Sequence, residues 1–365
     1  MSTKLHDLFE RCGQSPWLDN IQRSHIESGH LTSMRDRGVR GLTSNPAIFQ
    51  KAIKGSSDYD TQFRTLIAAG ESIEASYWQM VITDICSALE IFRPVYDTSS
   101  GGDGFVSVEV DPRLANDTSG TIAAARWLRA QIPHPNVMIK VPATKAGIPA
   151  IEQLISEGCN VNVTLIFSVP RYAEVMDAYL TGLERRLTSS DADLSGIASV
   201  ASFFISRVDS EIDPILESNG ATQLQGRAAI NQGILAYDLF RQKFSGERWD
   251  KLRLKGAKVQ RPLWASTSTK NAAYPDTLYV DTLIGPDTVN TLPENTLEAF
   301  ADHGHVARTI DTEVNAAKAQ WSALADHGVD VDAVAAKLER EGVGAFINSF
   351  DDLLESLAAK ANTFS

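Results

Sequence analysis

The sequence predicts an α/β protein with parallel strands, in its simplest form a TIM (β/α)8 barrel with additional C-terminal helices. Segments of strand character alternate with segments of helical period almost to the end of the chain, which is typical of parallel α/β proteins. Eight strand segments can be counted, the number that closes such a barrel. A doubly wound open sheet is the alternative. We expect residues 1–365 to form one domain.

The expected strands cover residues 15–19, 38–44, 105–111, 136–142, 160–167, 197–204, 258–266 and 277–283. Helical periodicity lies between them, most clearly over residues 115–131, 169–187 and 223–243. In the second of these helices Ser168 can cap the first turn and Pro170 lies near its start. After the eighth strand we expect helices over residues 306–326, 331–340 and 344–361. This block, about 306–365, should close the last barrel unit and pack on its outside.

Composition is that of a globular protein with a large core: 43% of the 365 residues are hydrophobic and 22% are charged. The net charge of -12 and the lack of a basic block argue against nucleic acid or an anionic membrane surface as a partner. Cys12, Cys86 and Cys159 are far apart, so we expect free thiols in a reducing compartment, the cytoplasm. We expect neither a signal peptide nor a membrane span.

Lys140 is the anomalous residue of the fourth expected strand, because it stands within the apolar run 137–142. Taking an ammonium out of water is costly, so burial favours the neutral amine, the form that attacks a carbonyl to make a Schiff base. The plainer interpretations are a lysine paired with a carboxylate or one on an exposed edge strand.

In several strands the polar residues occupy alternate positions and therefore share one parity. In the fifth expected strand, for example, Asn162 and Thr164 alternate with Val161, Val163 and Leu165. In a barrel this parity faces the interior, near the C-terminal mouth where active sites lie. We therefore expect one pocket to hold Asp19, Glu109, Lys140, Asn162, Thr164 and Ser202.

Each of these residues also has a structural interpretation. Asp19, and likewise Ser44 or Asn45, could cap a helix. Glu109 could be a structural partner of Lys140, and the remaining polar groups could be hydrogen-bonded within the core.

Two long motifs resemble those of transaldolases: GLTSNPAIF at 41–49, and IKVPAT at 139–144 followed by GCNVNVTLIFS at 158–168. SVEVDP at 107–112 and the segment 341–351 also fit, and the similarity covers nearly the whole chain. It is greatest to the longer bacterial transaldolases. The resemblance implies a barrel enzyme of the pentose phosphate pathway that needs no cofactor or metal. Such an enzyme moves a dihydroxyacetone unit from sedoheptulose 7-phosphate or fructose 6-phosphate to glyceraldehyde 3-phosphate or erythrose 4-phosphate.

The resemblance also assigns roles by position. Lys140 matches the Schiff-base lysine, Glu109 and Thr164 match the pair that holds a water for proton transfer, and Asp19 matches the acid/base of carbon–carbon cleavage. The expected substrate-binding residues are Asn45, Asn162, Ser202 and Phe204.

Arg207 and Ser266 match ligands of the substrate phosphate. Many relatives have an arginine two residues after the position of Ser266, where this chain has Ser268. Lys270 is the nearest cation that could take its place. From spacing alone, Arg207 would instead be interpreted as a surface ion pair with Asp209.

Two other functions compete with this interpretation. Fructose-6-phosphate aldolases resemble transaldolases but favour a tyrosine at the position of Phe204 and a glutamine at that of Glu109, so both residues favour transfer. An inactive scaffold barrel would be expected to lack a lysine or an acid, and none is missing. His303 and His305 are the one close histidine pair in the sequence, and we expect no metal site. The sequence leaves open whether the protein is a monomer or a homodimer.

Overall fold

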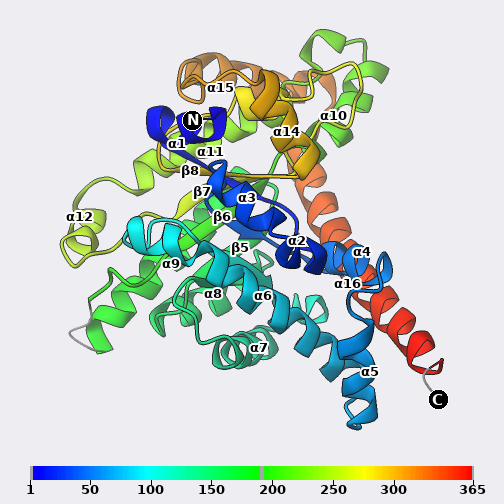
Figure 1. Ribbon diagram of the computed structural model, residues 1–365. Coiled ribbons are helices and arrows are strands. Elements are labelled where there is room, and N and C mark those ends of the chain that lie inside the picture. The colour runs from blue at the N-terminus through cyan, green and yellow to red at the C-terminus, as the bar shows by residue number, and fades with distance from the viewer. Residues whose placement is uncertain (1–2, 190–192, 364–365) are drawn as a thin grey trace.

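The computed structural model describes residues 3–189 and 193–363, and its strands form a closed parallel barrel in the order β1 to β8 (Figure 1). The strands are β1 Gln14–Leu18, β2 Leu42–Thr43, β3 Val106–Glu109, β4 Val137–Pro142, β5 Val161–Ile166, β6 Ser199–Phe204, β7 Arg261–Ala265 and β8 Thr288–Leu292. β1 pairs with β8 along its whole length, from Gln14 opposite Thr288 to Leu18 opposite Leu292. This pairing confirms the predicted barrel and excludes an open sheet.

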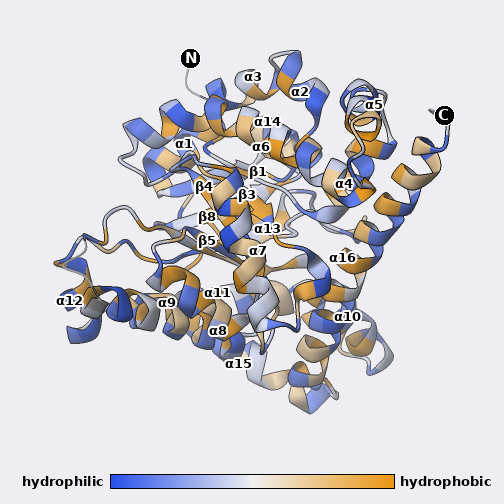
Figure 2. Ribbon diagram, turned by 90° about the horizontal axis from the view of Figure 1, so that it is seen from below, coloured by the Kyte–Doolittle hydropathy of each residue, from blue (hydrophilic) through white to orange (hydrophobic). Residues whose placement is uncertain are grey.

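Helices connect successive strands and cover the barrel. They are α1 Lys4–Cys12, α2 Arg23–Glu27, α3 His30–Asp36, α4 Pro46–Lys54, α5 Asp60–Ala68, α6 Ile73–Thr98, α7 Thr118–Gln131, α8 Gly147–Ser156, α9 Val169–Ser189, α10 Ser206–Ser218, α11 Ala228–Lys243, α12 Glu247–Arg253, α13 Leu278–Asp281, α14 Glu294–His303, α15 Val314–Ala323 and α16 Val331–Ala361. In Figure 2 the helices alternate between hydrophilic and hydrophobic residues along their length, as expected of helices with one buried side. Within the described ranges, no helix is both long and apolar enough to span a membrane.

The predicted eighth strand, residues 277–283, is wrong. Leu278–Asp281 forms α13, and β8 lies further along at Thr288–Leu292. A short apolar run does not distinguish a strand from a buried helical turn, and Tyr279 and Val280 are indeed buried. The true strand, TVNTL, carries three polar residues and so lacks the apolar run expected of a buried parallel strand.

The C-terminal segment also differs from expectation. Residues 331–361 form one continuous helix, α16, where two helices were predicted. Gly342 is compatible with this helix and allows it to lie close to the barrel, because a Cβ there would be 3.0 Å from Leu165 of β5. α16 packs against α4, α6 and α10, and Figure 1 shows it running beside α4. The helix therefore reaches the end of the barrel at which the strands terminate.

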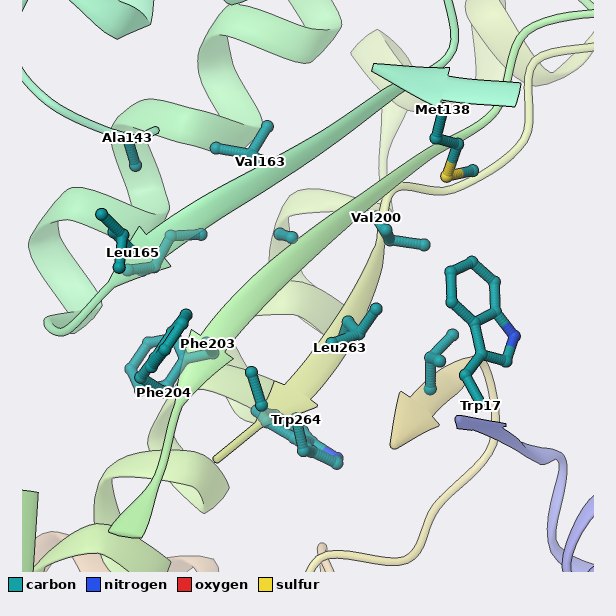
Figure 3. Packing of buried hydrophobic residues seen from close by; sticks show 14 of the residues in the cluster. Trp17, Met138, Ala143, Val163, Leu165, Val200, Phe203, Phe204, Leu263 and Trp264 are labelled. Atoms are coloured by element: carbon teal, nitrogen blue, oxygen red, sulfur yellow. The ribbon is translucent and has the colours of Figure 1, made fainter. Parts of the chain in front are cut away.

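A layer of apolar side chains fills the barrel beneath this end. Figure 3 shows Met138, Val200 and Leu263 pointing into the space between the strands, and all three are buried. Met138 precedes Lys140 by two residues, and Val200 precedes Ser202 by two. Since side chains alternate along a strand, Lys140 and Ser202 point in the same direction one layer higher.

Candidate active site

A cavity of about 140 Å³ lies at the C-terminal mouth of the barrel. The predicted site residues that line it are Asp19, Asn45, Lys140, Thr164, Ser202, Phe204, Arg207, Ser266 and Lys270. The two remaining predicted residues, Glu109 and Asn162, are buried behind the wall and reach the cavity through hydrogen bonds to Lys140 and Ser202. The fold therefore brings all of these residues together, while the role of each stays a prediction.

Lys140 is buried and 4% exposed, and its Nζ donates hydrogen bonds to Glu109 Oε2 and to the backbone oxygen of Ser44, each at 3.1 Å. Glu109 and Lys140 are also direct partners in the pairing of β3 with β4. Burial raises the pKa of Glu109, and the Lys140 charge opposes that rise. The closed barrel excludes the exposed edge strand as an explanation for the lysine. What remains is a buried lysine paired with a carboxyl group whose pKa is raised by burial, and perturbed groups of this kind cluster at functional sites.

Asp19 is held at the seam where β1 meets β8. Its backbone N–H donates to the oxygen of Leu292 at 2.8 Å, and its carboxylate accepts a hydrogen bond from the Thr43 hydroxyl at 2.8 Å. Thr43 in turn lies 2.6 Å from the hydroxyl of Thr291. Burial raises the pKa of Asp19, while the charge of Lys140 and the hydrogen bond from Thr43 act in the opposite direction. The side chain is thus a second carboxyl group with a fixed orientation toward the cavity.

The polar wall around Lys140 contains one hydroxyl that no protein group satisfies. Thr164 Oγ1 is buried without a hydrogen-bond partner among the residues that the structure describes. Buried hydroxyls rarely stay unpaired, so a water or a substrate oxygen is expected there. Ser202, by contrast, donates to Asn162 Oδ1 at 2.7 Å, and Asn162 donates to Ser107 at 3.0 Å. Asn162 therefore orients Ser202 and does not itself line the cavity.

Asn45 combines two of the interpretations given above. Its Oδ1 accepts a hydrogen bond from the backbone N–H of Ile48 at 3.0 Å and so caps α4. The same side chain lines the cavity. Because the cap uses only the oxygen, the amide nitrogen is available to a substrate hydroxyl.

The side of the cavity formed after β6 and β7 carries positive charge. Arg207, the second residue of α10, stacks over the Phe204 ring at 5.2 Å and has no ion pair within the described part of the chain. The surface pair with Asp209 is absent, because Asp209 is buried and accepts from the Tyr279 hydroxyl at 2.8 Å. Lys270 Nζ donates to Ser268 at 2.8 Å. An unpaired arginine at a helix N-terminus and a lysine that lines the same cavity make a suitable anion site.

Ser266 is held at this edge by the first turn of α10. Its backbone oxygen accepts from the N–H of Ser206 at 3.0 Å, and the two hydroxyls are also 3.0 Å apart. Ser266 adopts a left-handed backbone conformation with φ of 56°. Residues other than glycine seldom adopt this conformation. The loop therefore turns sharply where the predicted phosphate ligand stands.

Sequence reasoning missed several residues of the cavity wall, among them Thr43, Thr291, Pro293 and Phe346. Thr291 was missed because it lies in the true eighth strand. Phe346 comes from α16, and Lys140 Nζ lies 5.6 Å from the centre of its ring. The one available signal for Phe346 was its place within the motif at 341–351.

A parallel barrel with a buried lysine, two carboxyl groups and an anion site at its C-terminal mouth has the architecture of a barrel enzyme. Comparison with known proteins agrees with this class. The family model described as Transaldolase/Fructose-6-phosphate aldolase matches residues 16–357. The chain is 50% identical to "Transaldolase" of Parafrankia sp. (98% of both chains) and 50% identical to "Transaldolase 1" of Streptomyces avermitilis (95% of this chain, 93% of the relative). It is 44% identical to "Transaldolase 2" of Nostoc punctiforme over the whole of both chains.

The chain therefore belongs to the transaldolase family and is an enzyme, a transferase.

Proposed function

We propose that this enzyme moves a dihydroxyacetone unit from sedoheptulose 7-phosphate or fructose 6-phosphate to glyceraldehyde 3-phosphate or erythrose 4-phosphate, through a Schiff base on Lys140. The observation that carries the proposal is the buried pair of Lys140 and Glu109, 3.1 Å apart at the cavity wall. Asp19 is close enough to Glu109 for its charge to influence the pKa of that carboxyl group. Phosphorylated sugars are the proposed partners.

The first step joins the enzyme to the ketose. The neutral amine of Lys140 attacks the C2 carbonyl and forms a carbinolamine. The C2 hydroxyl then accepts a proton and leaves as water, and the lone pair of the Lys140 nitrogen forms the C=N double bond of a protonated imine. The raised pKa of Glu109 suits it to supply that proton. The unpaired hydroxyl of Thr164 is available to hold the water through which the proton moves.

The second step breaks the bond between C3 and C4. Asp19 takes the proton of the C4 hydroxyl, the aldose leaves with a new carbonyl, and the bonding electrons move into the protonated imine to give an enamine. The enamine then adds to the acceptor aldehyde in the reverse of this cleavage, which forms a new carbon–carbon bond and restores the imine. Hydrolysis of that imine releases the product and frees Lys140. The fixed bond from Thr43 keeps Asp19 oriented throughout. A positioned acid or base of this kind contributes about 10²–10⁴-fold in rate.

The phosphate of each substrate requires local positive charge in a protein of net charge -12. Arg207 can bind a phosphate through two parallel hydrogen bonds, since no protein carboxylate occupies its guanidinium in the described structure. Ser266 and Lys270 line the same cavity. Binding at this end would leave the ketone carbonyl directed toward Lys140.

Transfer and simple cleavage can be separated by one assay. Fructose 6-phosphate is incubated with the enzyme, with and without erythrose 4-phosphate, and glyceraldehyde 3-phosphate is measured. We expect release to depend on the acceptor, because the enamine stays on Lys140 until an aldehyde arrives. Fast release without acceptor would instead identify an aldolase, and a Lys140→Ala control should be inactive in both arms.

The pentose phosphate pathway and a cytoplasmic location belong to the same proposal. Support for the pathway comes from the family of the chain. Cys12, Cys86 and Cys159 are all free thiols, as expected of a protein from a reducing compartment.

A further inference from the structure

A second group of chemically active side chains lies outside the cavity. It consists of His25 on α2, His30 at the start of α3 and Glu294 at the start of α14. Their donor atoms lie within 4.8 Å of one another, and no other trio of histidine, cysteine or acidic residues among residues 3–189 and 193–363 meets this criterion. Because Glu294 is 264 positions from His30 in the sequence, sequence spacing gave no sign of the group.

The trio has the geometry of a metal site that needs only a small adjustment. His30 Nε2 lies 2.7 Å from Glu294 Oε1, and the two imidazole rings meet edge to face with centroids 4.6 Å apart. Zinc binds nitrogen at about 2.0–2.1 Å, so the ligand atoms of a tetrahedral site are about 3.4 Å apart. Small side-chain rotations would therefore close the distance to His25 and open the bond between His30 and Glu294.

We propose that His25, His30 and Glu294 bind one divalent transition metal ion, with Zn²⁺ as the natural candidate. Two imidazoles and one carboxylate are donors that zinc prefers. Three protein ligands leave the fourth position to water, and His30 and Glu294 are 38% and 32% exposed, so an ion can enter from solvent. The plainer interpretation is an ion pair between His30 and Glu294, which makes no use of His25.

Each ligand stands on a helix that other contacts already hold in place. α2 is fixed through Arg23, whose Nε donates to the buried Asp84 at 2.8 Å. α3 buries Leu31 and Met34. α14 buries Leu297 and Phe300 in the same way. Ligands on rigid elements lose little conformational entropy when they bind.

The position of the trio indicates what the metal would do. α2 follows Asp19 after a short loop, and Glu294 directly follows Pro293, which lines the cavity. The metal would join these two segments at the β1–β8 seam, where the N–H of Asp19 is bonded to Leu292. Since none of the three ligands lines the cavity, the ion would be structural and would stabilise the segment that carries Asp19.

The test uses the full chain without an affinity tag, stripped with EDTA and then dialysed. Co²⁺ is titrated while its visible absorption is recorded, Zn²⁺ is then added in competition, and thermal unfolding is followed with and without Zn²⁺. We expect one equivalent of Co²⁺ per chain, its displacement by Zn²⁺, and a higher melting temperature in Zn²⁺.

His25→Ala and Glu294→Gln should each weaken binding at least about tenfold and remove the gain in melting temperature. His303→Ala is the matched control, because His303 is an exposed histidine that contacts Asp276 at 2.9 Å, and it should bind Co²⁺ like the wild type. Circular dichroism verifies that each variant is folded. The proposal is overturned if the wild type shows no saturable binding of one ion below about 1 mM, or if His25→Ala binds as the wild type does.

Discussion

Removing the hydroxyl that holds Asp19 should move the acid limb of the pH–rate profile. In Thr43→Val the side chain keeps its shape but loses the bond to Asp19 Oδ1, which is 2.8 Å long. That hydrogen bond favours the charged carboxylate and lowers the pKa of Asp19, while burial raises it. Without the bond the pKa rises further, so less of the carboxylate exists at any pH below neutrality. Because the proposed base must be ionised, the variant should lose activity first on the acid side.

The magnitude follows from the strength of a hydrogen bond to a charged group, about 1.5–3 kcal/mol. At about 1.36 kcal/mol per pKa unit, the acid limb of kcat/KM should shift upward by about one to two units. At a pH above the pKa of Asp19 in both proteins, the difference should largely disappear.

The assay is acceptor-dependent glyceraldehyde 3-phosphate release between pH 5 and pH 9, chosen as a range of about two units on either side of neutrality. Thr291→Val is the control, because it removes the 2.6 Å contact to Thr43 but leaves the donor to Asp19 in place. Its acid limb should stay near that of the wild type. An unshifted limb in Thr43→Val, or an equal shift in both variants, would refute the assignment of Asp19 as the base.

Three further predictions concern binding and stability. Arg207→Ala should raise KM for fructose 6-phosphate by about 10- to 150-fold, as expected for loss of a charged hydrogen bond. KM for unphosphorylated fructose should change little, and equal effects on the two sugars would argue against a phosphate ligand. Asp103→Ala should lower the free energy of unfolding in urea by about 3–5 kcal/mol, because it leaves Arg40 and Arg261 without their buried partner. Asp19→Asn should raise the melting temperature at pH 8 more than at pH 4. Burial raises the pKa of Asp19 in the folded state, so the ionised carboxylate lowers the stability of the wild type at high pH. This destabilisation disappears as the pH falls below the pKa of Asp19 in the folded state. A gain that grows toward low pH would contradict this sign.

The barrel could be predicted because seven of its strands overlap segments of strand character that helical periodicity separates in the sequence. The eighth failed for a physical reason. Residues 277–283 bury Tyr279, Val280 and Leu283 yet are helical over Leu278–Asp281, while β8 carries Thr288, Asn290 and Thr291 and looks too polar for a buried strand. Which apolar run joins the sheet is decided by tertiary pairing, here by contact of β8 with β1.

The site was predictable where a polar residue interrupts a buried strand, as Lys140 and Glu109 do. It was not predictable where the signal is tertiary. Phe346 reaches the cavity because α16 lies against β5. The periodicity of apolar residues within α16 does not indicate that Phe346 lines the cavity. Asn162 accepts a hydrogen bond from Ser202 and is not among the residues that line the cavity, and its contact with substrate stays a prediction.

The central claim is that the amine of Lys140 becomes bonded to the substrate. The most direct measurement is reduction with borohydride in the presence of fructose 6-phosphate, followed by intact mass and peptide mapping. We predict one reduced dihydroxyacetone or ketose adduct per chain, located on Lys140, absent in Lys140→Ala and still present in Asp19→Asn. An adduct on a different lysine, or none in the wild type, would contradict the account.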